Sequence, residues 1–394
     1  MNDLQQPQLP IWTLLAFTLA GFITIMTEII PAGLLPLISH DLHVSESLAG
    51  QLISVYAFGS VVTAIPVIFA TRSWSRKYLF LFAISGLFIF NSLTAISSNY
   101  FLILFLRFLS GMAAGIMWGV LAGYARNIVA INLQGRAMAI VGIGQPIALC
   151  IGVPIGTWLG NLLGWRGVFL IISGLTAGLI IWVQTQLPHV QGKSNSQKIS
   201  IKEVLYHPGI CSILAVIFLW ILAHNILYTF ISPYLVSVNL SKYLDFILFI
   251  FGISSILGIW ITGIFIDKIL RKLVLINLLG FTCAVLLMGI LSNQIWAIII
   301  GVALWGITFG GAPTLLQTAI ADTAGDHVDI AQSMLVTVFN LAVAGGGIAG
   351  GILLKEFGIS SFFISMAFLS LMGLLIVFLA KKHGFKSGSR VIES

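Results

Sequence analysis

The sequence predicts an all-α polytopic membrane protein whose twelve transmembrane helices form two pseudo-symmetric six-helix halves. Three observations support this fold class: the composition, the spacing of apolar stretches and the distribution of positive charge. Hydrophobic residues make up 59% of the 394 residues and charged residues only 8%, whereas about 25% of the residues in a soluble domain are charged. The mean hydropathy of +1.08 places the chain among membrane proteins.

Apolar stretches of about 20 residues, long enough for a helix to cross a bilayer, recur twelve times along the chain. They cover roughly 11–38, 47–70, 78–97, 100–126, 136–162, 166–187, 208–237, 243–266, 273–292, 295–321, 329–354 and 359–380. The longest polar linker separates the sixth stretch from the seventh. We therefore expect an N-terminal six-helix bundle at 1–187, a cytoplasmic linker at 188–207, a C-terminal six-helix bundle at 208–380 and a cytoplasmic tail at 381–394.

The positively charged residues set the expected orientation. If the N-terminus is inside, 15 of the 19 Lys and Arg residues fall in cytoplasmic segments, and Arg166, Lys242 and Lys355 fall outside. The remaining one, Arg107, lies within a span. Cytoplasmic loops carry the excess of Lys and Arg, so both termini are expected in the cytoplasm. The net charge of +7 is then an orientation signal, and no nucleic-acid partner is expected, because that function needs a soluble basic surface.

The two halves echo each other in sequence. Arg76 in the SRK stretch after the second span and Arg271 in the LRK stretch after the eighth are 195 residues apart. The same offset carries Gly152 of the fifth span onto Gly347 of the eleventh. Repeated halves are typical of secondary transporters, whose sites lie near the bilayer midplane between the repeats.

Glu28 is the only acid well inside a predicted span. A charged side chain at the bilayer centre costs about 2.5–3.5 kcal/mol on insertion scales, and a low dielectric disfavours the ionised carboxylate. Such a group can bind and release a proton, as a proton-coupled carrier requires. Gly21, Thr24, Pro31 and Ala32 share its helix face, which is small and polar enough to line a cavity. The alternative is a structural glutamate that is hydrogen-bonded inside the bundle.

Arg107 is the only basic residue inside a predicted span. Counted at 1.5 Å per residue, Arg107 and Glu28 lie about 10 and 15 Å from the outer ends of their helices, so they are expected in the same half of the bilayer. Arginine stays protonated when buried and would favour the ionised form of a nearby acid. The alternative is a static structural ion pair.

The seventh span carries a polar group, His224, Asn225 and Tyr228, and His224 lies 196 residues after Glu28. These side chains offer hydrogen bonds to a polar substrate. A histidine titrates in the physiological range, so proton carriage stays open beside cavity lining and simple helix packing.

Further polar or aromatic side chains inside spans are Tyr56, Asn91, Trp118, Gln145, Trp305, Gln317 and Asn340. Of these, we expect Tyr56, Trp118, Trp305, Gln317 and Asn340 to line the substrate cavity with Thr24 and the seventh-span group. A cavity that is largely aromatic with a few polar groups is typical of ligand sites.

Enzyme signatures do not occur in the sequence. It has no Walker A motif, no paired carboxylates and no nucleophile constellation. Cys150, Cys211 and Cys283 lie in apolar segments without zinc or disulfide spacing. We therefore expect no enzyme activity, no cofactor and no metal.

Four motifs carry a resemblance to a known family. They are TEIIPAGLLPLIS at 27–39 with the DLHVSESLAGQ that follows, RFLSG at 107–111, GVPIGTWLGNLLGWRGVF at 152–169 and GIFIDKILRK at 263–272. In these motifs the chain resembles the major facilitator superfamily over nearly its whole length. Within it, the chain is similar to the twelve-span drug:proton antiporter branch, near the bacterial sugar-efflux and nucleoside-efflux permeases.

The resemblance implies roles for particular residues. It implies a coupling role for Arg107 and an antiporter motif in helix 5 at Gly152, Pro154 and Gly156. It also implies that spans 4 and 10 face the cavity with spans 1 and 7. A gating loop motif of the form G-x-L-A-D-R-x-G-R-R is matched in the second half by Gly263, Asp267, Lys268, Arg271 and Lys272.

The first copy of this loop motif is degenerate. It reads IFATRSWSRK, which keeps Arg76 and Lys77 but places Ile68 at the glycine and Arg72 at the acid. The charge pair that the resemblance implies at that inner loop therefore lacks its acid, and the intact copy of the motif is the second one.

These observations predict a secondary active efflux transporter that exports a small organic solute, either a sugar, a nucleoside or an amphipathic drug, by proton antiport with alternating access. One alternative is an uncoupled facilitator of a small polar metabolite, and another is a non-transporting membrane sensor or scaffold. The expected partners are the small-molecule substrate, protons and the lipid bilayer, with the chain acting as a monomer. The resemblance implies a bacterial inner membrane.

Overall fold

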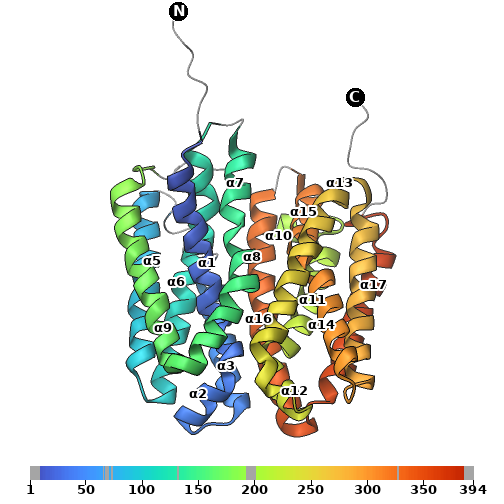
Figure 1. Ribbon diagram of the computed structural model, residues 1–394. Coiled ribbons are helices and arrows are strands. Elements are labelled where there is room, and N and C mark those ends of the chain that lie inside the picture. Colours follow the sequence, from blue (N-terminus) through green and yellow to red (C-terminus); the bar gives the residue numbers. More distant parts are fainter. Residues whose placement is uncertain are drawn as a thin grey trace, which may run out of the picture.

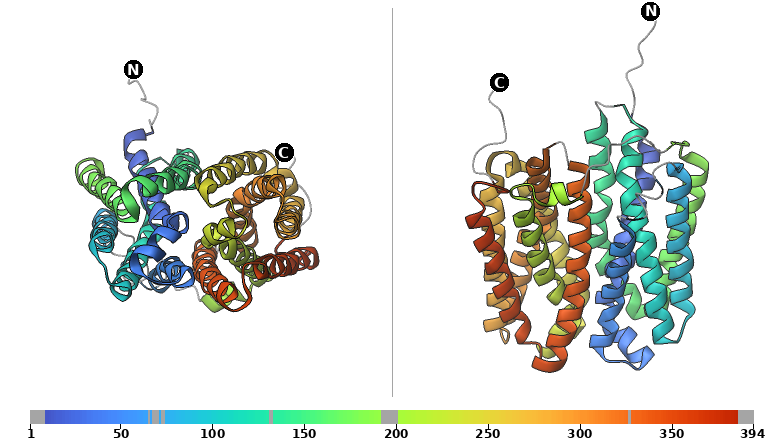
Figure 2. Two further views of the ribbon diagram at one scale, coloured as in Figure 1. Left: turned by 60° about the horizontal axis from the view of Figure 1, so that its bottom comes forward. Right: turned by 180° about the vertical axis from the view of Figure 1, so that it is seen from behind.

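A computed structural model describes residues 9–385, apart from 65, 67–70, 72–73, 131–132, 192–200 and 326–327. The described residues form helices and turns, without strands. Two groups of helices lie side by side, as the view toward the end of the bundle shows in Figure 2. The chain starts α1 and finishes α17 at the same end, at the top of Figure 1. We call this end the termini end and the opposite end, where α2 and α12 lie, the far end.

The first half contains the helices up to residue 186. They are α1 (Ile11–Gly33), α2 (Leu35–Leu42), α3 (Glu46–Ala64), α5 (Arg76–Ile96), α6 (Tyr100–Asn127), α7 (Gln134–Gly142), α8 (Gly144–Ile147), the π-helical turn η2 (Ala148–Gly152) and α9 (Val153–Gln186).

The second half follows the predicted linker. It contains α10 (Ile201–Leu205), α11 (Ile210–Thr229), α12 (Ile231–Ser237), the 3₁₀ turn η3 (Ser241–Tyr243), α13 (Leu244–Ile290), α14 (Ile295–Gly310), α15 (Ala312–Ala324), α16 (Val328–Phe357) and α17 (Ser361–Leu379).

Nine stretches of the described chain are long and apolar enough to cross a membrane. Two of them, Arg136–Gln186 and Ser241–Ile290, are 51 and 50 residues long, about twice what one span needs. Each contains a sharp turn: Gly164 in α9 has φ 72° and ψ 163°, and Ile269 in α13 has φ −140° and ψ 35°. The first combination suits only glycine. Read as two spans each, the two long stretches bring the number to eleven, and α3 (Glu46–Ala64) lies at the remaining predicted span, 47–70. The architecture is therefore consistent with the twelve predicted spans.

The segment 267–272, predicted to link the eighth and ninth spans, lies within α13 and contains the kink at Ile269, where two helical segments meet. Four of its six residues are charged, and they flank the kink.

Glycines set the closest helix contacts and reveal the repeat in three dimensions. A Cβ at Gly111 of α6 would collide with the backbone of Tyr56 in α3, and a Cβ at Gly306 of α14 would collide with the backbone of Phe251 in α13. Both members of the second contact lie 195 residues after those of the first. The sequence offset therefore corresponds to the same helix pair built twice, with glycines allowing close approach.

The two halves are joined toward the far end. Ser47 Oγ donates to the Gly351 carbonyl at 3.0 Å, and Gln51 Nε2 donates to the Gly347 carbonyl at 3.3 Å, both from the first turns of α3 to α16. A third contact lies between η2 and α13, where Cys150 Sγ donates to the Gly252 carbonyl at 2.8 Å. The first two bonds join the halves near the far end, and the third joins them about two helical turns into α13.

Candidate functional site

Glu28 lies on α1, six residues before the break at Leu34 that separates α1 from α2. It is only 5% exposed. Among the described residues, its carboxylate forms neither an ion pair nor a hydrogen bond. An unpartnered buried polar group costs about 1–3 kcal/mol, and more when it is charged. Glu28 is therefore a carboxylate with capacity for a proton, a water molecule or a substrate group.

Arg107 of α6 is fully buried beside it and is held by backbone groups. Its Nε donates to the Leu52 carbonyl at 3.2 Å, and its Nη2 donates to the backbone carbonyl of Glu28 at 3.3 Å. Its guanidinium carbon lies 4.6 Å from the ring centre of Tyr56 and 5.7 Å from that of Phe169. Buried Nη1 has no partner among the described residues. The two charged residues are thus close, but a direct ion pair does not form in this conformation.

The local helix packing explains why Arg107 reaches across to α3 and α1. Gly111, one helical turn later on α6, removes the side chain that would separate α6 from α3. The space that this leaves lets the guanidinium meet the carbonyl of Leu52 on α3. A bundle interior supplies few acceptors other than such carbonyls, and a buried cation needs them.

Polar side chains of α1, α3 and α5 complete this first cluster. Tyr56 Oη donates to the Thr24 carbonyl at 3.0 Å, which places two predicted cavity residues together. Asn91 Nδ2 donates to Thr27 Oγ1 at 2.9 Å, directly beside Glu28 in sequence. Thr27 was not among the predicted site residues, although it directly precedes Glu28 in the sequence.

The second half contains an aromatic cluster around His224, formed by α11, α13, α14 and the rings of Tyr228, Phe251, Trp305 and Phe309. The imidazole stacks on the Phe309 ring at 3.5 Å with an interplanar angle of 3°. Phe251 and Trp305 lie 4.5 Å apart, centre to centre. His224, Tyr228 and Trp305 were predicted to line the cavity. Phe251 and Phe309 were not among the predicted cavity residues, although Phe309 lies one helical turn after Trp305.

One hydrogen bond fixes the protonation pattern of His224. The Trp305 indole, which can only donate, donates to His224 Nδ1 at 3.0 Å. Nδ1 therefore carries no proton, and the imidazole is neutral with its hydrogen on Nε2. The cluster contains a second polar group that a ligand could hydrogen-bond, because the buried Tyr228 hydroxyl has no partner among the described residues. Its chemistry is aromatic, uncharged and able to donate hydrogen bonds.

The remaining predicted cavity residues lie outside these two clusters. Asn225 and Asn340 are buried, and their Nδ2 atoms donate to the carbonyls of Ile221 and Val336 in their own helices. Trp118 is half-buried, with its ring 3.9 Å from where a Cβ on Gly21 would lie.

Gln317 is exposed on α15, and its carbonyl accepts a hydrogen bond from Gln332. It therefore contacts a neighbouring helix of its own half.

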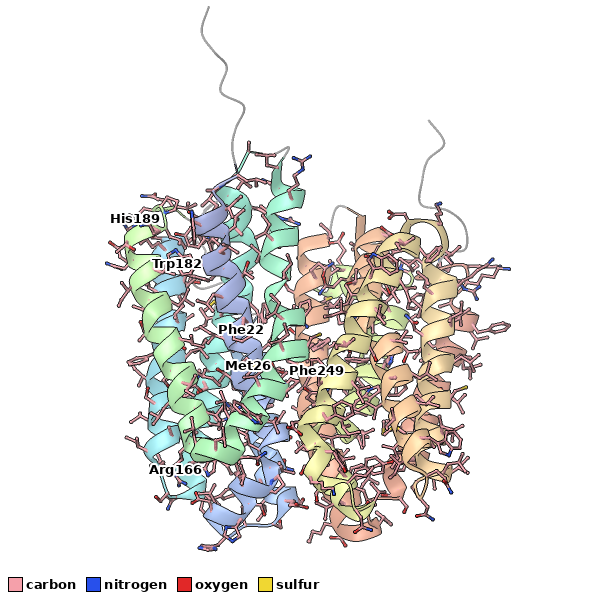
Figure 3. All side chains as sticks on the ribbon, viewed as in Figure 1. Phe22, Met26, Arg166, Trp182, His189 and Phe249 are labelled. Atoms are coloured by element: carbon pink, nitrogen blue, oxygen red, sulfur yellow. The ribbon has the colours of Figure 1, made fainter. Side chains whose placement is uncertain are left out.

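The helix-5 motif packs against α1. Cβ atoms at Gly152 and Gly156 would collide with the side chains of Met26 and Ile30, and Figure 3 shows Phe22 and Met26 along α1 beside this helix. Pro154 stands in the first turn of α9, directly after the π-helical turn η2. A π-helical turn therefore directly precedes Pro154, and such turns are common at functional sites.

Basic residues of the two loop-motif copies cap helix ends within their own halves. Buried Lys77 donates from Nζ to the carbonyls of Gln184 and Leu187, at 2.9 and 2.8 Å, at the end of α9. Arg271 donates from Nη2 to the Phe378 carbonyl at 2.9 Å, near the end of α17. Cations near helix C-termini are stabilising, so both residues have a structural role here besides the expected gating role.

The structure also describes the other residues predicted for the gating loop motif. The Arg76 backbone N–H donates to Val190. Gly263, Asp267, Lys268 and Lys272 are exposed on α13. The degenerate positions Ile68 and Arg72 lie outside the described residues.

Comparison with known proteins shows the family of this chain. Residues 17–269 and 242–393 match the sequence profile of the Major Facilitator Superfamily. A probable sugar efflux transporter of Helicobacter pylori (strain J99) is 26% identical over 87% of this chain and 88% of its own length. A probable sugar efflux transporter of Pasteurella multocida (strain Pm70) is 25% identical over 94% and 92%. The transcription regulatory protein OpdE of Pseudomonas aeruginosa is 27% identical over 93% of both chains.

A solved structure shares the fold. The human organic anion transporter MFSD10 covers 94% of this chain and 100% of its own, with a TM-score of 0.69 and 16% sequence identity. At this identity the likeness concerns the fold alone. The family match, the long apolar helices and the doubled helix packing lead to one conclusion: the chain is a multi-pass membrane transporter that belongs to the Major Facilitator Superfamily.

Proposed function

We propose that this transporter exports a sugar by proton antiport, with Glu28 as the proton carrier. The observation that carries the proposal is the buried Glu28 carboxylate, which has no fixed partner among the described residues although a buried arginine lies beside it. A carboxylate committed to structure would be paired or hydrogen-bonded. One that must gain and lose a proton in each cycle keeps its oxygen atoms available.

The coupling step follows from the position of Arg107. In a conformation open to the outside, Glu28 takes up a proton as the substrate leaves. Rocking of the halves then carries the protonated group inward. Arg107 holds the Glu28 carbonyl and stays charged when buried, so a small shift of α1 against α6 brings the guanidinium to the carboxylate and favours proton release as the next substrate binds.

The substrate class rests on the aromatic cluster of the second half and on the names of the relatives. The cluster around His224 has no charged member and offers the Tyr228 hydroxyl and the His224 Nε2 hydrogen. Flat aromatic faces with hydrogen-bond donors suit the apolar face and hydroxyl rim of a sugar ring, and disfavour a dedicated site for ions. Two relatives are named probable sugar efflux transporters, which favours sugars over nucleosides and amphipathic drugs.

The two halves differ in the functional groups that they carry. Positions 195 residues after Arg107 and Tyr56 are Val302 and Phe251, so the second half repeats the scaffold without the charge. We infer that the first half couples the proton and the second recognises the substrate. We also propose a bacterial inner-membrane location with both termini in the cytoplasm, and action as a monomer.

The test is substrate-induced proton release from purified protein in weakly buffered detergent solution. Wild type, Glu28→Gln and the matched control Glu203→Gln, an exposed acid of α10, receive a panel of sugars, nucleosides and lipophilic cations. We expect release by wild type and control on addition of a sugar, and none by Glu28→Gln. Binding without proton release in all three proteins would indicate a facilitator. Release by Glu28→Gln would remove this residue from the coupling mechanism.

A further inference from the structure

A groove on the membrane-facing surface lies where the two halves meet. Six residues line it, and we call it the seam groove: Pro154, Ile155 and Trp158 of α9 with Asp245, Phe246 and Phe249 of α13. Its volume is about 260 Å³. Figure 3 shows Phe249 at the boundary between the two groups of helices. Anything that fills the groove contacts both halves at once.

The groove is polar at one end and apolar at the other. Asp245 stands in the first turn of α13, at the far end, and Phe249 follows one helical turn deeper. On the opposite wall, Trp158 lies six residues before the Gly164 turn, and Pro154 and Ile155 lie one turn deeper. Phe246 and Trp158 are 53% and 52% exposed. A headgroup at the membrane boundary followed by an acyl chain has the same polarity order.

Asp245 is the only charged residue of the six. Its Oδ1 accepts a hydrogen bond from the Phe246 backbone N–H at 2.9 Å, and it forms no ion pair among the described residues. The carboxylate therefore keeps acceptor capacity and an uncompensated negative charge beside the apolar surface. An ammonium group complements it, and an anionic headgroup is repelled by it.

Trp158 supplies the complementary group. Tryptophan favours the membrane–water interface, where its ring is apolar and its N–H can donate. The Trp158 N–H makes no hydrogen bond to another described residue, so it is available to a phosphate oxygen next to the ammonium.

From this arrangement we propose that the seam groove binds a phosphatidylethanolamine molecule, with the ammonium on Asp245, the phosphate near Trp158 and the acyl chain along Ile155, Phe246 and Phe249. A primary ammonium donates hydrogen bonds to a carboxylate, whereas the trimethylated ammonium of phosphatidylcholine cannot. The bound lipid bridges α9 and α13 and stabilises the conformation in which the halves are joined.

The experiment measures lipid retention by the full-length protein with native mass spectrometry, after reconstitution in equal amounts of phosphatidylethanolamine and phosphatidylcholine. Asp245→Asn removes the charge and keeps the ability to accept the Phe246 N–H. Glu356→Gln is the matched control, because it removes an exposed acid at the far end of α16, outside the groove. We expect wild type and control to retain phosphatidylethanolamine preferentially. The preference should fall about two- to fivefold in Asp245→Asn, the size of a partly exposed ion pair.

Two further measurements keep the outcome decisive. The thermal midpoint of wild type should rise more in phosphatidylethanolamine than in phosphatidylcholine, and this difference should shrink in Asp245→Asn. Free ethanolamine should not reproduce the shift, since it lacks the acyl chain. Equal retention of the two lipids by wild type, or an unchanged preference in Asp245→Asn, overturns the proposal. Neither result depends on proton coupling or on sugar transport.

Discussion

The hydrogen bonds between α3 and α16 predict how the far side opens. Ser47 and Gln51 each donate to a backbone carbonyl across the boundary between the halves, at 3.0 and 3.3 Å. We expect the double variant Ser47→Ala, Gln51→Met to lose both bonds while preserving helix-compatible side chains. Each bond contributes about 0.5–1.5 kcal/mol. Their loss weakens closure by about 1–3 kcal/mol, a shift of about five- to 150-fold in the conformational equilibrium.

Spin labels at the exposed residues Ser45 and Ser360 report this shift as a distance distribution in nanodiscs. The exposed Cys211 and Cys283 are first replaced by serine. The double variant should populate longer distances than wild type. Ser92→Ala is the control, because it removes a bond from Ser92 Oγ to the Phe88 carbonyl inside one helix. An unchanged distribution in the double variant would refute the idea that these bonds hold the far side closed.

Three other substitutions follow from single contacts. Trp305→Phe removes the donor to His224 Nδ1 and should weaken substrate binding severalfold in calorimetry, since one lost hydrogen bond costs about 1 kcal/mol. Lys77→Met removes two charge-assisted bonds at the end of α9 and should destabilise the protein by at least about 2 kcal/mol, seen as a lower thermal midpoint. Gly306→Ala places a methyl group against the Phe251 backbone and should cost about 1–3 kcal/mol, measured in the same thermal assay.

Each of these substitutions has a matched control. Trp260→Phe changes a membrane-facing indole and should leave substrate affinity unchanged. Lys268→Met removes an exposed cation of α13, and Gly174→Ala adds a methyl group where no other atom lies within 4 Å. If a control loses as much affinity or stability as its partner variant, the contact assigned to that partner is not responsible.

The sequence predicted the fold class because hydropathy and repeat length constrain it strongly. It also placed Gly164 and the polar segment 267–272 between spans, and the structure turns at Gly164 and Ile269. The helical geometry on both sides of Ile269 was not predictable, because a short segment with four charged residues suits a loop and a kinked helix equally well.

Site residues could be predicted where their side chains are rare inside apolar spans, as charged residues are. They could not be predicted where the side chain is common there. Glu28 and Arg107 are conspicuous in an apolar chain, and they do meet. Arg107 contacts the backbone carbonyl of Glu28. Every residue has such a carbonyl, so this contact could not be predicted from a pattern of side chains. Phe251 and Phe309 are two of 27 phenylalanines, and only packing distinguishes the two that touch His224.

The contact between Cys150 and Gly252 has a mechanical consequence. A Cβ at Gly252 would collide with the backbone of Cys150, so here the two halves meet main chain to main chain, inside the helices and away from their ends. A rigid body that turns about an interior point moves its two ends in opposite directions. This contact can therefore serve as the fulcrum of a lever. When the halves separate at one side of the membrane, they approach each other at the other side, and no further coupling between the two sides is needed.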